Sequence, residues 1–269
     1  MNKTERTMVE LLKNGREEHG VVSVKAEFEA EGTRIDELLR LVEIARNADL
    51  SLTVKIGGCE AVRDLLDAKQ IGVAYVVAPM VETRYALGKY LAAKNGVYDS
   101  DEQSDTDFLF NMETICGFEN RNEIISAAAA QNGANGVVFG RVDFAGSLGE
   151  TPSVVNNPEI TSKVLEVAKL AKHAGLDFVL GGGISSEAIE VLKSVRKTHL
   201  SRFETRKIVF AGEAAESPEL EKALLNAVHF EMLWLINKRN YYTRITQEDE
   251  NRIAMLENRW RILGMASIH

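Results

Sequence analysis

A parallel α/β barrel is the fold class that the sequence predicts, and three features indicate it. Seven short apolar segments typical of buried strands alternate with helical segments along the chain. The length of 269 residues, 45% of them hydrophobic, suits one barrel of roughly 250 residues. Charged residues alternate with apolar ones in the first strands, which places a polar face toward the barrel axis. We therefore expect a single barrel domain over residues 1–269, of the (β/α)8 type with additional C-terminal helices.

The predicted elements follow one another in regular order. An amphipathic helix at residues 4–18 comes first, and Thr33 is a typical N-cap for the helix after the first strand. The predicted strands are residues 21–29, 52–56, 73–80, 108–112, 136–142, 178–180 and 207–210. The predicted helices between them are residues 33–47, 60–70, 82–94, 119–131, 160–174 and 186–196. The pattern does not assign an eighth strand.

Residues 216–269 are predicted to form a helical C-terminal extension. Ser217-Pro218-Glu219 is typical of a helix start, with an N-cap, an early proline and an early acid. The segment 223–236 is apolar almost all round, and such a helix must be buried on most faces. We expect it to lie at an oligomer interface, which makes the protein a homo-oligomer; burial within its own chain is the alternative. One more helix is predicted from residue 246 to residue 263.

Composition excludes several classes of protein. The net charge is −8, the pI is about 5.3 and no basic stripe occurs, so we expect no nucleic-acid partner. Cys59 and Cys116 are too few to build a disulfide framework, which favours a reducing compartment. No apolar run approaches the ~18 residues of a membrane span, and the N-terminus has no signal sequence. These features predict a cytoplasmic protein with no membrane partner.

Two acidic residues carry most of the functional information. Glu113 closes the apolar run 108–112, and Asp143 closes the run 136–142. One crossover helix separates these runs, so we expect neighbouring parallel strands whose carboxylates emerge at the same edge. Close carboxylates repel each other unless a cation lies between them, and their hard oxygens suit Mg²⁺ or Mn²⁺. The alternative is that both acids only cap helices or pair with Lys or Arg.

Further charged residues are expected to point toward the barrel axis near its C-terminal rim. Buried charges must pair or bind something, so this set is either a ligand site or a structural network of ion pairs. The set comprises Lys25, Glu27, Glu29, Lys55, Glu113, Arg141 and Asp143. Lys55 and Arg141 are the expected anchors for an anionic substrate.

A glycine-rich turn follows the strand at residues 178–180. Backbone N–H groups of Gly181, Gly182 and Gly183 could hold a phosphate or carboxylate, which would make them substrate-binding residues. Equally, three glycines could simply allow close packing of a helix.

Motifs over residues 24–149 resemble those of the HpcH/HpaI aldolase and citrate lyase β-subunit family. Residues 67–82 are similar to the family's strand and Pro-Met turn, Met112-Glu113-Thr114 to its Glu-Thr metal motif, and residues 140–149 to its Gly-x-x-Asp signature. The resemblance implies a TIM barrel, oligomeric assembly and a divalent metal held by Glu113 and Asp143. It also implies carbon–carbon bond cleavage or formation through the enolate of a small 2-oxo acid such as pyruvate or oxaloacetate.

The chain departs from the family pattern at two positions. Lys25-Ala26-Glu27-Phe28 stands where the family's aldolases have Asp-Ala-Glu-His, and Lys55 aligns with an arginine that supports the substrate carbonyl. The expected catalytic residues are therefore Lys25, Glu27, Glu29 and Lys55, with Glu29 or Lys25 in place of the histidine base.

The leading hypothesis is a metal-dependent carbon–carbon lyase, or aldolase, that acts on a 2-oxo acid. The alternatives are a citrate lyase-like or malyl-CoA-like thioester lyase, a Schiff-base enzyme that uses Lys25 or Lys55, and a barrel that has lost the base and only binds a ligand.

Overall fold

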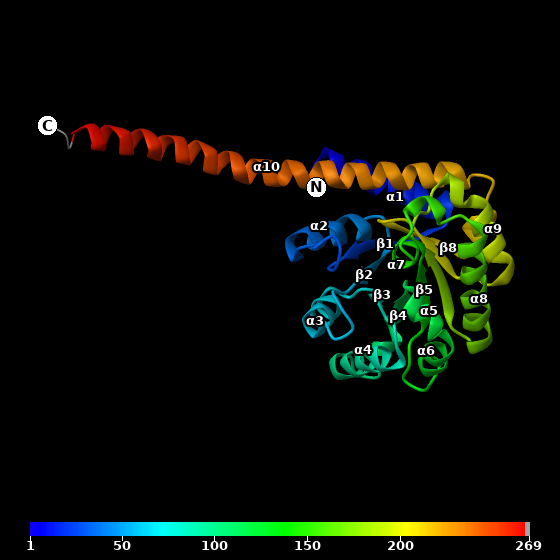
Figure 1. The fold of residues 1–269 in the computed structure, drawn as a ribbon. Coiled ribbons are helices and arrows are strands. Elements are labelled where there is room, and N and C mark those ends of the chain that lie inside the picture. Colours follow the sequence, from blue (N-terminus) through cyan, green and yellow to red (C-terminus); the bar gives the residue numbers. More distant parts are fainter. Residues whose placement is uncertain (267–269) are drawn as a thin grey trace.

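The computed structural model describes residues 1–266 and contains a closed barrel of eight strands surrounded by helices (Figure 1). This confirms the predicted TIM-type α/β barrel. The strands are β1 (Val21–Glu27), β2 (Ser51–Lys55), β3 (Tyr75–Ala78), β4 (Asp107–Met112), β5 (Gly136–Gly140), β6 (Asp177–Gly181), β7 (Arg202–Glu204) and β8 (Ile208–Ala211). The helices are α1 (Lys3–His19), α2 (Ile35–Arg46), α3 (Val62–Ile71), α4 (Arg84–Val97), α5 (Ile115–Glu119), α6 (Arg121–Ala128), α7 (Arg141–Ser147), α8 (Pro158–Ala174), α9 (Ile189–Thr198) and α10 (Leu220–Ala266). Short 3₁₀ turns are η1 (Glu102–Ser104), η2 (Pro152–Val154), η3 (Ser186–Ala188) and η4 (Gly212–Glu216).

Two layers of side chains follow from the alternation along the strands. The outer faces of the strands pack against the helices and form the main core, to which Val24 and Ala26 of β1 belong. Inside the barrel, a small apolar cluster of Val77, Leu109 and Val179 with Val138 fills the middle. Polar side chains occupy the rest of the interior, so the polar face of β1 does point toward the axis.

A hairpin closes the barrel. β1 to β7 pair in parallel from one strand to the next, but β8 pairs antiparallel with both β7 and β1. The expectation of parallel strands throughout is therefore wrong for the predicted strand 207–210. Only three residues, 205–207, separate β7 from β8, and so short a connection cannot contain a crossover helix. As a result, β8 ends at the N-terminal rim, where Ala211 N–H donates to the carbonyl of Gly20 at 2.8 Å.

The C-terminal extension is one helix rather than two. α10 has 47 residues and runs without a break through residues 237–245, where the sequence analysis ended one helix and began another. No glycine or proline interrupts the chain between Glu219 and Leu263, so nothing in the backbone ends the helix there. The predicted extension 216–269 includes residues 267–269, which lie outside the described residues.

The first half of α10 packs on its own barrel and the second half projects from it (Figure 1). Leu220, Ala223, Ala227, Phe230 and Trp234 are buried against the body of the same chain. This is the alternative that the sequence analysis left open for residues 223–236. The opposite face of the same segment nevertheless remains exposed.

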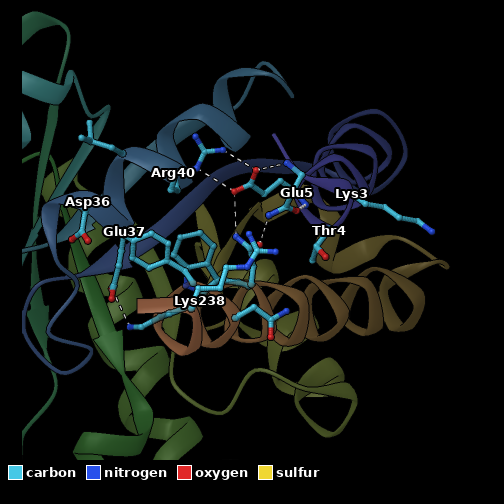
Figure 2. Close-up of a pocket in the computed structure, with 14 residues that line it drawn as sticks. Lys3, Thr4, Glu5, Asp36, Glu37, Arg40 and Lys238 are labelled. Atoms are coloured by element: carbon cyan, nitrogen blue, oxygen red, sulfur yellow. Dashed lines mark hydrogen bonds and ion pairs between the residues drawn. The ribbon is translucent and has the colours of Figure 1, made fainter. Parts of the chain in front are cut away.

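Two buried carboxylates fasten the middle of α10 near the C-terminal rim. Glu5 of α1 accepts hydrogen bonds from Arg40 of α2 at 2.8 Å and from Asn237 of α10 at 3.3 Å. Glu37 of α2 accepts from Lys238 of α10 at 3.0 Å. Figure 2 shows these residues around a cavity of about 590 Å³ between the three helices. The position at which α10 leaves the barrel is therefore fixed by a hydrogen bond to α1 and an ion pair to α2.

Candidate functional site

Glu113 is the most completely enclosed acid at the C-terminal rim. It follows β4 directly, and its side chain is only 1% exposed. One carboxylate oxygen accepts from the backbone N–H of Met80 at 3.0 Å, and the other from Asn111 Nδ2 at 2.5 Å. Gly140 at the end of β5 makes room for it, because a Cβ there would lie 2.7 Å from Oε2 of Glu113. Two strands, β4 and β5, and the β3–α4 turn thus cooperate to hold one carboxylate.

Asp143 lies beside Glu113 but in a different setting from the one expected. β5 ends at Gly140, and Asp143 belongs to the first turn of α7 rather than to the end of a strand. The early end of β5 is consistent with a helix N-terminus at Arg141, where an acid is favourable. Asp143 is exposed, and it has no hydrogen bond or ion pair with any of residues 1–266. Burial raises the pKa of Glu113, and the nearby charge of Asp143 raises it further, against the opposing effects of Lys55, Asn111 and Met80.

Lys55 connects this acid to the loop after β1. Its Nζ lies 2.8 Å from Oε2 of Glu29 and 3.5 Å from Glu113, and its side chain is buried. Burial alone would lower the pKa of Lys55, but Glu113 and Glu29 outweigh it and raise the pKa above its ordinary value. Lys55 is therefore a fixed cation between two carboxylates.

Lys25 lies between an acid of its own strand and an acid of β7. Its Nζ lies 3.0 Å from Glu27 and 2.5 Å from Glu204 of β7. Although burial would lower the pKa of Lys25, Glu204 and Glu27 raise it well above its ordinary value. The amines of both Lys25 and Lys55 are thus held in the protonated form, which does not fit the Schiff-base alternative, since that chemistry needs a neutral lysine.

Glu204 is a member of the site that the sequence analysis missed. It lies in a three-residue strand that no apolar run announces, since Arg202 and Glu204 flank a single Phe203. The predicted strand 207–210 was the signal that could have led to it. A strand that belongs to a hairpin has its partner next to it in the sequence, and β7 directly precedes this strand.

Arg141, one of the two expected substrate anchors, is already bonded to backbone carbonyls and to one side-chain amide. It is fully buried and donates to the carbonyls of Gly181 at 3.4 Å and Gly183 at 3.1 Å, to the carbonyl of Val155 at 3.4 Å, and to Oδ1 of Asn156 at 2.8 Å. Four of its five N–H groups are therefore used. Burial lowers the pKa of Arg141 to about 10, so it remains a cation at neutral pH.

The glycine turn after β6 is built around this arginine. Gly182 and Gly183 have φ values of 77° and 65°, which favour glycine. A Cβ on Gly182 would lie 2.6 Å from the backbone nitrogen of Val142. The turn therefore packs directly on the start of α7, with two of its carbonyls directed at Arg141.

The carboxylates of Glu113 and Asp143 are the candidate ligands for a hard divalent cation at this rim, and among the described residues no group of three or more His, Cys, Asp or Glu side chains could hold one. One carboxylate is buried with a raised pKa, and a neighbouring carboxylate has no partner among the described residues, so a cation between them would relieve their repulsion. Lys55 already neutralises part of this charge from the other side of Glu113.

The family follows from the sequence model that matches residues 17–203, which is more than half of the chain. The chain belongs to the HpcH/HpaI aldolase/citrate lyase family. Family membership supports a lyase- or aldolase-type activity, and it confirms the resemblance drawn from the motifs around Glu113 and Asp143. The matched span includes β1 to β7 but not β8 or α10. A search of curated proteins finds no match to the sequence.

Several solved structures share the fold. An HpcH/HpaI aldolase from Desulfitobacterium hafniense DCB-2 superposes with a TM-score of 0.59 at 15% identity, covering 74% of this chain and 82% of that one. Citrate synthase SbnG gives 0.57 at 16% identity, with the same coverage. An HpcH/HpaI aldolase/citrate lyase family protein from Burkholderia cenocepacia J2315 gives a TM-score of 0.56 at 16% identity, covering 72% of this chain and 81% of that one.

No helix within residues 1–266 is long and apolar enough to span a membrane.

Proposed function

We propose that the protein is a carbon–carbon lyase, or aldolase, that acts through the enolate of a 2-oxo acid of the pyruvate or oxaloacetate type. The observation that carries the proposal is the pair formed by buried Glu113 and partnerless Asp143, within the span that matches the family. These two residues would hold Mg²⁺ or Mn²⁺, with water and substrate oxygens as the remaining ligands. When bound, the cation would supply Lewis-acid stabilisation of the charge that develops on the enolate oxygen.

Lys55 and Glu29 are the residues placed to act on the substrate. The ammonium of Lys55 would bind the substrate carboxylate or carbonyl oxygen, in the place where the family has arginine. Glu29 is the more exposed partner of Lys55, with a side chain 25% accessible, and it would serve as the base that the family's histidine provides. Lys25 and Glu27 would set the charge of the pocket, and Arg141 would position the glycine turn and α7.

A barrel that only binds its ligand is the second candidate. Phe28 stands in place of the family's histidine, and the cavity of about 590 Å³ lies between helices rather than at the barrel mouth. The thioester alternative relies on the N–H groups of the glycine turn, and that turn packs directly on the start of α7, where a Cβ on Gly182 would lie 2.6 Å from the nitrogen of Val142.

Exchange of the pyruvate methyl protons in D₂O, followed by NMR with and without Mg²⁺ or Mn²⁺, tests the proposal. We expect exchange that requires the metal and that Asp143→Asn abolishes, while Glu150→Gln, another exposed acid after α7, leaves it unchanged. Binding of Mn²⁺ is measured in parallel by electron paramagnetic resonance. Metal and pyruvate binding without exchange would favour the ligand-binding barrel, and exchange that is independent of metal would contradict the metal site.

A further inference from the structure

The face of α10 that points away from the barrel carries a regular row of exposed apolar side chains. In the first half of the helix these are Leu225, Val228, Met232 and Leu235, which are 50–67% exposed. In the projecting half they are Ile253, Leu256 and Trp260, which are 49–80% exposed. Large apolar side chains that gather on one face of a helix mark an interaction surface.

The spacing of this row is that of a coiled coil. Successive members are three and four residues apart in alternation, which is the a/d pattern of a heptad repeat. Leu263 continues the spacing at the end of the row. The row skips Arg239, Tyr242, Thr246 and Asp249, which occupy the four central a/d positions. The seam therefore has two apolar ends and a polar middle.

We propose that α10 forms an antiparallel two-stranded coiled coil with α10 of a second copy of this chain, with the two-fold axis between residues 242 and 246 of the seam. In this register the residue numbers of facing a and d positions add up to 488, and every apolar member meets an apolar partner. The facing pairs are Leu225 with Leu263, Val228 with Trp260, Met232 with Leu256, Leu235 with Ile253, Arg239 with Asp249, and Tyr242 with Thr246. The overlap of 225–263 spans about 57 Å at 1.5 Å per residue.

Charge complementarity selects the antiparallel arrangement. Arg239 of one copy would face Asp249 of the other, and both side chains are exposed with no ion pair inside the described part of their own chain. In a parallel dimer each of these residues would face its own copy, with like charges opposed at the seam.

The positions that flank the seam agree with the antiparallel register. Glu231 would lie opposite Arg259, and His229 opposite Glu257. Lys238 would lie near Arg252, but Lys238 is already neutralised by Glu37 of its own chain at 3.0 Å.

The barrel leaves this seam accessible. Ala223, Ala227, Phe230 and Trp234 face the body of the chain and are at most 5% exposed, whereas the seam residues of the same turns are at least half exposed. The projecting half has no body beneath it (Figure 1). At the centre of the seam, the Tyr242 hydroxyl donates to Glu37 of its own chain at 2.5 Å. A second helix can therefore lie along the two apolar ends of the seam while both barrels remain folded and this bond is kept.

The mass of the full chain in solution, measured by light scattering and sedimentation, is the first test. We expect a dimer at micromolar concentration that Leu235→Lys or Leu256→Lys dissociates. Leu66→Lys, an equally exposed leucine on α3, is the matched control and should leave the dimer intact. A monomer in the parent chain, or an oligomer that survives both seam substitutions, would overturn the proposal.

Charge reversal tests the register. Arg239→Asp and Asp249→Arg should each raise the dissociation constant by about tenfold, since the pair occurs twice in the dimer and tenfold corresponds to ~1.4 kcal/mol. The double variant should restore the parent value within about threefold. Residues 239 and 249 are too far apart on one helix to pair with each other, so rescue reports a contact between copies.

Cysteine crosslinking separates the two orientations. A chain carrying both Leu235→Cys and Ile253→Cys should oxidise to a covalent dimer, whereas Leu235→Cys alone should not. The parent chain, with half-buried Cys59 and Cys116, controls for the native thiols. Crosslinking by the single variant would indicate parallel helices and would overturn the antiparallel register.

Discussion

Gly140 shows how much a single residue decides at this site. It has φ of −90° and needs no special backbone conformation, so its role is spatial. Its hydrogen faces the carboxylate of Glu113, which is itself fixed by Met80 and Asn111. A larger residue at position 140 must move either the strand or the acid.

We predict that Gly140→Ala will weaken Mn²⁺ binding and metal-dependent proton exchange at least tenfold, because its Cβ would clash with Glu113. The chain should still fold, with a loss of stability of about 1–3 kcal/mol from overpacking. Gly146→Ala in the next helix is the control, since no atom lies within 4 Å of a Cβ there. Equal activity of the two variants would show that the position of Glu113 is not critical.

Lys55 and Arg141 should respond differently to the same substitution. Lys55→Met removes a charge beside the site, and we expect kcat/KM for the acid substrate to fall about 10- to 100-fold, which corresponds to 1.5–3 kcal/mol. Arg141→Met removes the donors to three backbone carbonyls and should cost about 3 kcal/mol or more of unfolding free energy. Urea unfolding and steady-state kinetics on both variants check the contrast. A change below threefold for Lys55→Met would exclude it as an anchor.

At the level of single residues, the sequence located the charges but not all of their partners. The alternation of β1 and β2 correctly directed Lys25 and Lys55 into the barrel. The same argument failed for Arg141 and Asp143, because it assumed a strand up to residue 142, whereas a helix begins at Arg141. Residues two positions apart, such as Arg141 and Asp143, share a face in a strand but not in a helix. No local pattern predicts that an arginine will be satisfied by the carbonyls of a distant glycine turn.

At the scale of elements, hydrogen bonds and ion pairs to buried carboxylates hold α1, α2 and α10 together. Burial alone would raise the pKa of Glu5, but hydrogen bonds from Arg40, Asn2 and Asn237 hold it below its ordinary value. A carboxyl group whose pKa is lower in the folded state than in the unfolded state stabilises the protein at pH values above the unfolded-state pKa. This stabilisation is lost as the pH falls through the folded-state pKa.

We predict that Glu5→Gln will destabilise the protein at pH 7 and that the difference from the parent will shrink below about pH 4. Urea unfolding at both pH values measures it. Glu10→Gln in the same helix, where the carboxylate is largely exposed, is the control and should have little effect at either pH. If the difference in unfolding free energy between Glu5→Gln and the parent does not vary with pH, the charge of Glu5 does not stabilise the contact between these helices.

The elements that the sequence predicted well are those with strong local periodicity. The six parallel strands β1 to β6 and the major helices follow from apolar spacing and capping residues. β7 was missed because three residues are too few to show a period, and the unbroken α10 was divided because its polar centre resembles a loop and a new N-cap. In both cases the deciding information lies in partners that are distant in the sequence.

At the scale of the whole molecule, the projecting half of α10 dominates the dimensions. A helix of 47 residues is about 70 Å long, whereas a compact chain of 269 residues has a radius of gyration of about 18 Å. We predict that small-angle scattering will give a radius of gyration clearly above the value for a compact chain, whether the protein is a monomer or a dimer. A compact value would mean that the distal half folds back on the barrel in solution.

The reversed direction of β8 decides where this long helix can act. If the last strand were parallel to the others, it would end at the C-terminal rim. The helix after it would then run toward the N-terminal rim, away from the site. Because β8 is antiparallel, α10 starts at the N-terminal rim, runs along the outside of the barrel and extends beyond the C-terminal rim. Its last fixed point is Glu37, at the start of the helix that follows the Glu29 loop. The last described anchor of α10 on the barrel therefore lies on the helix that directly follows the loop of the proposed base.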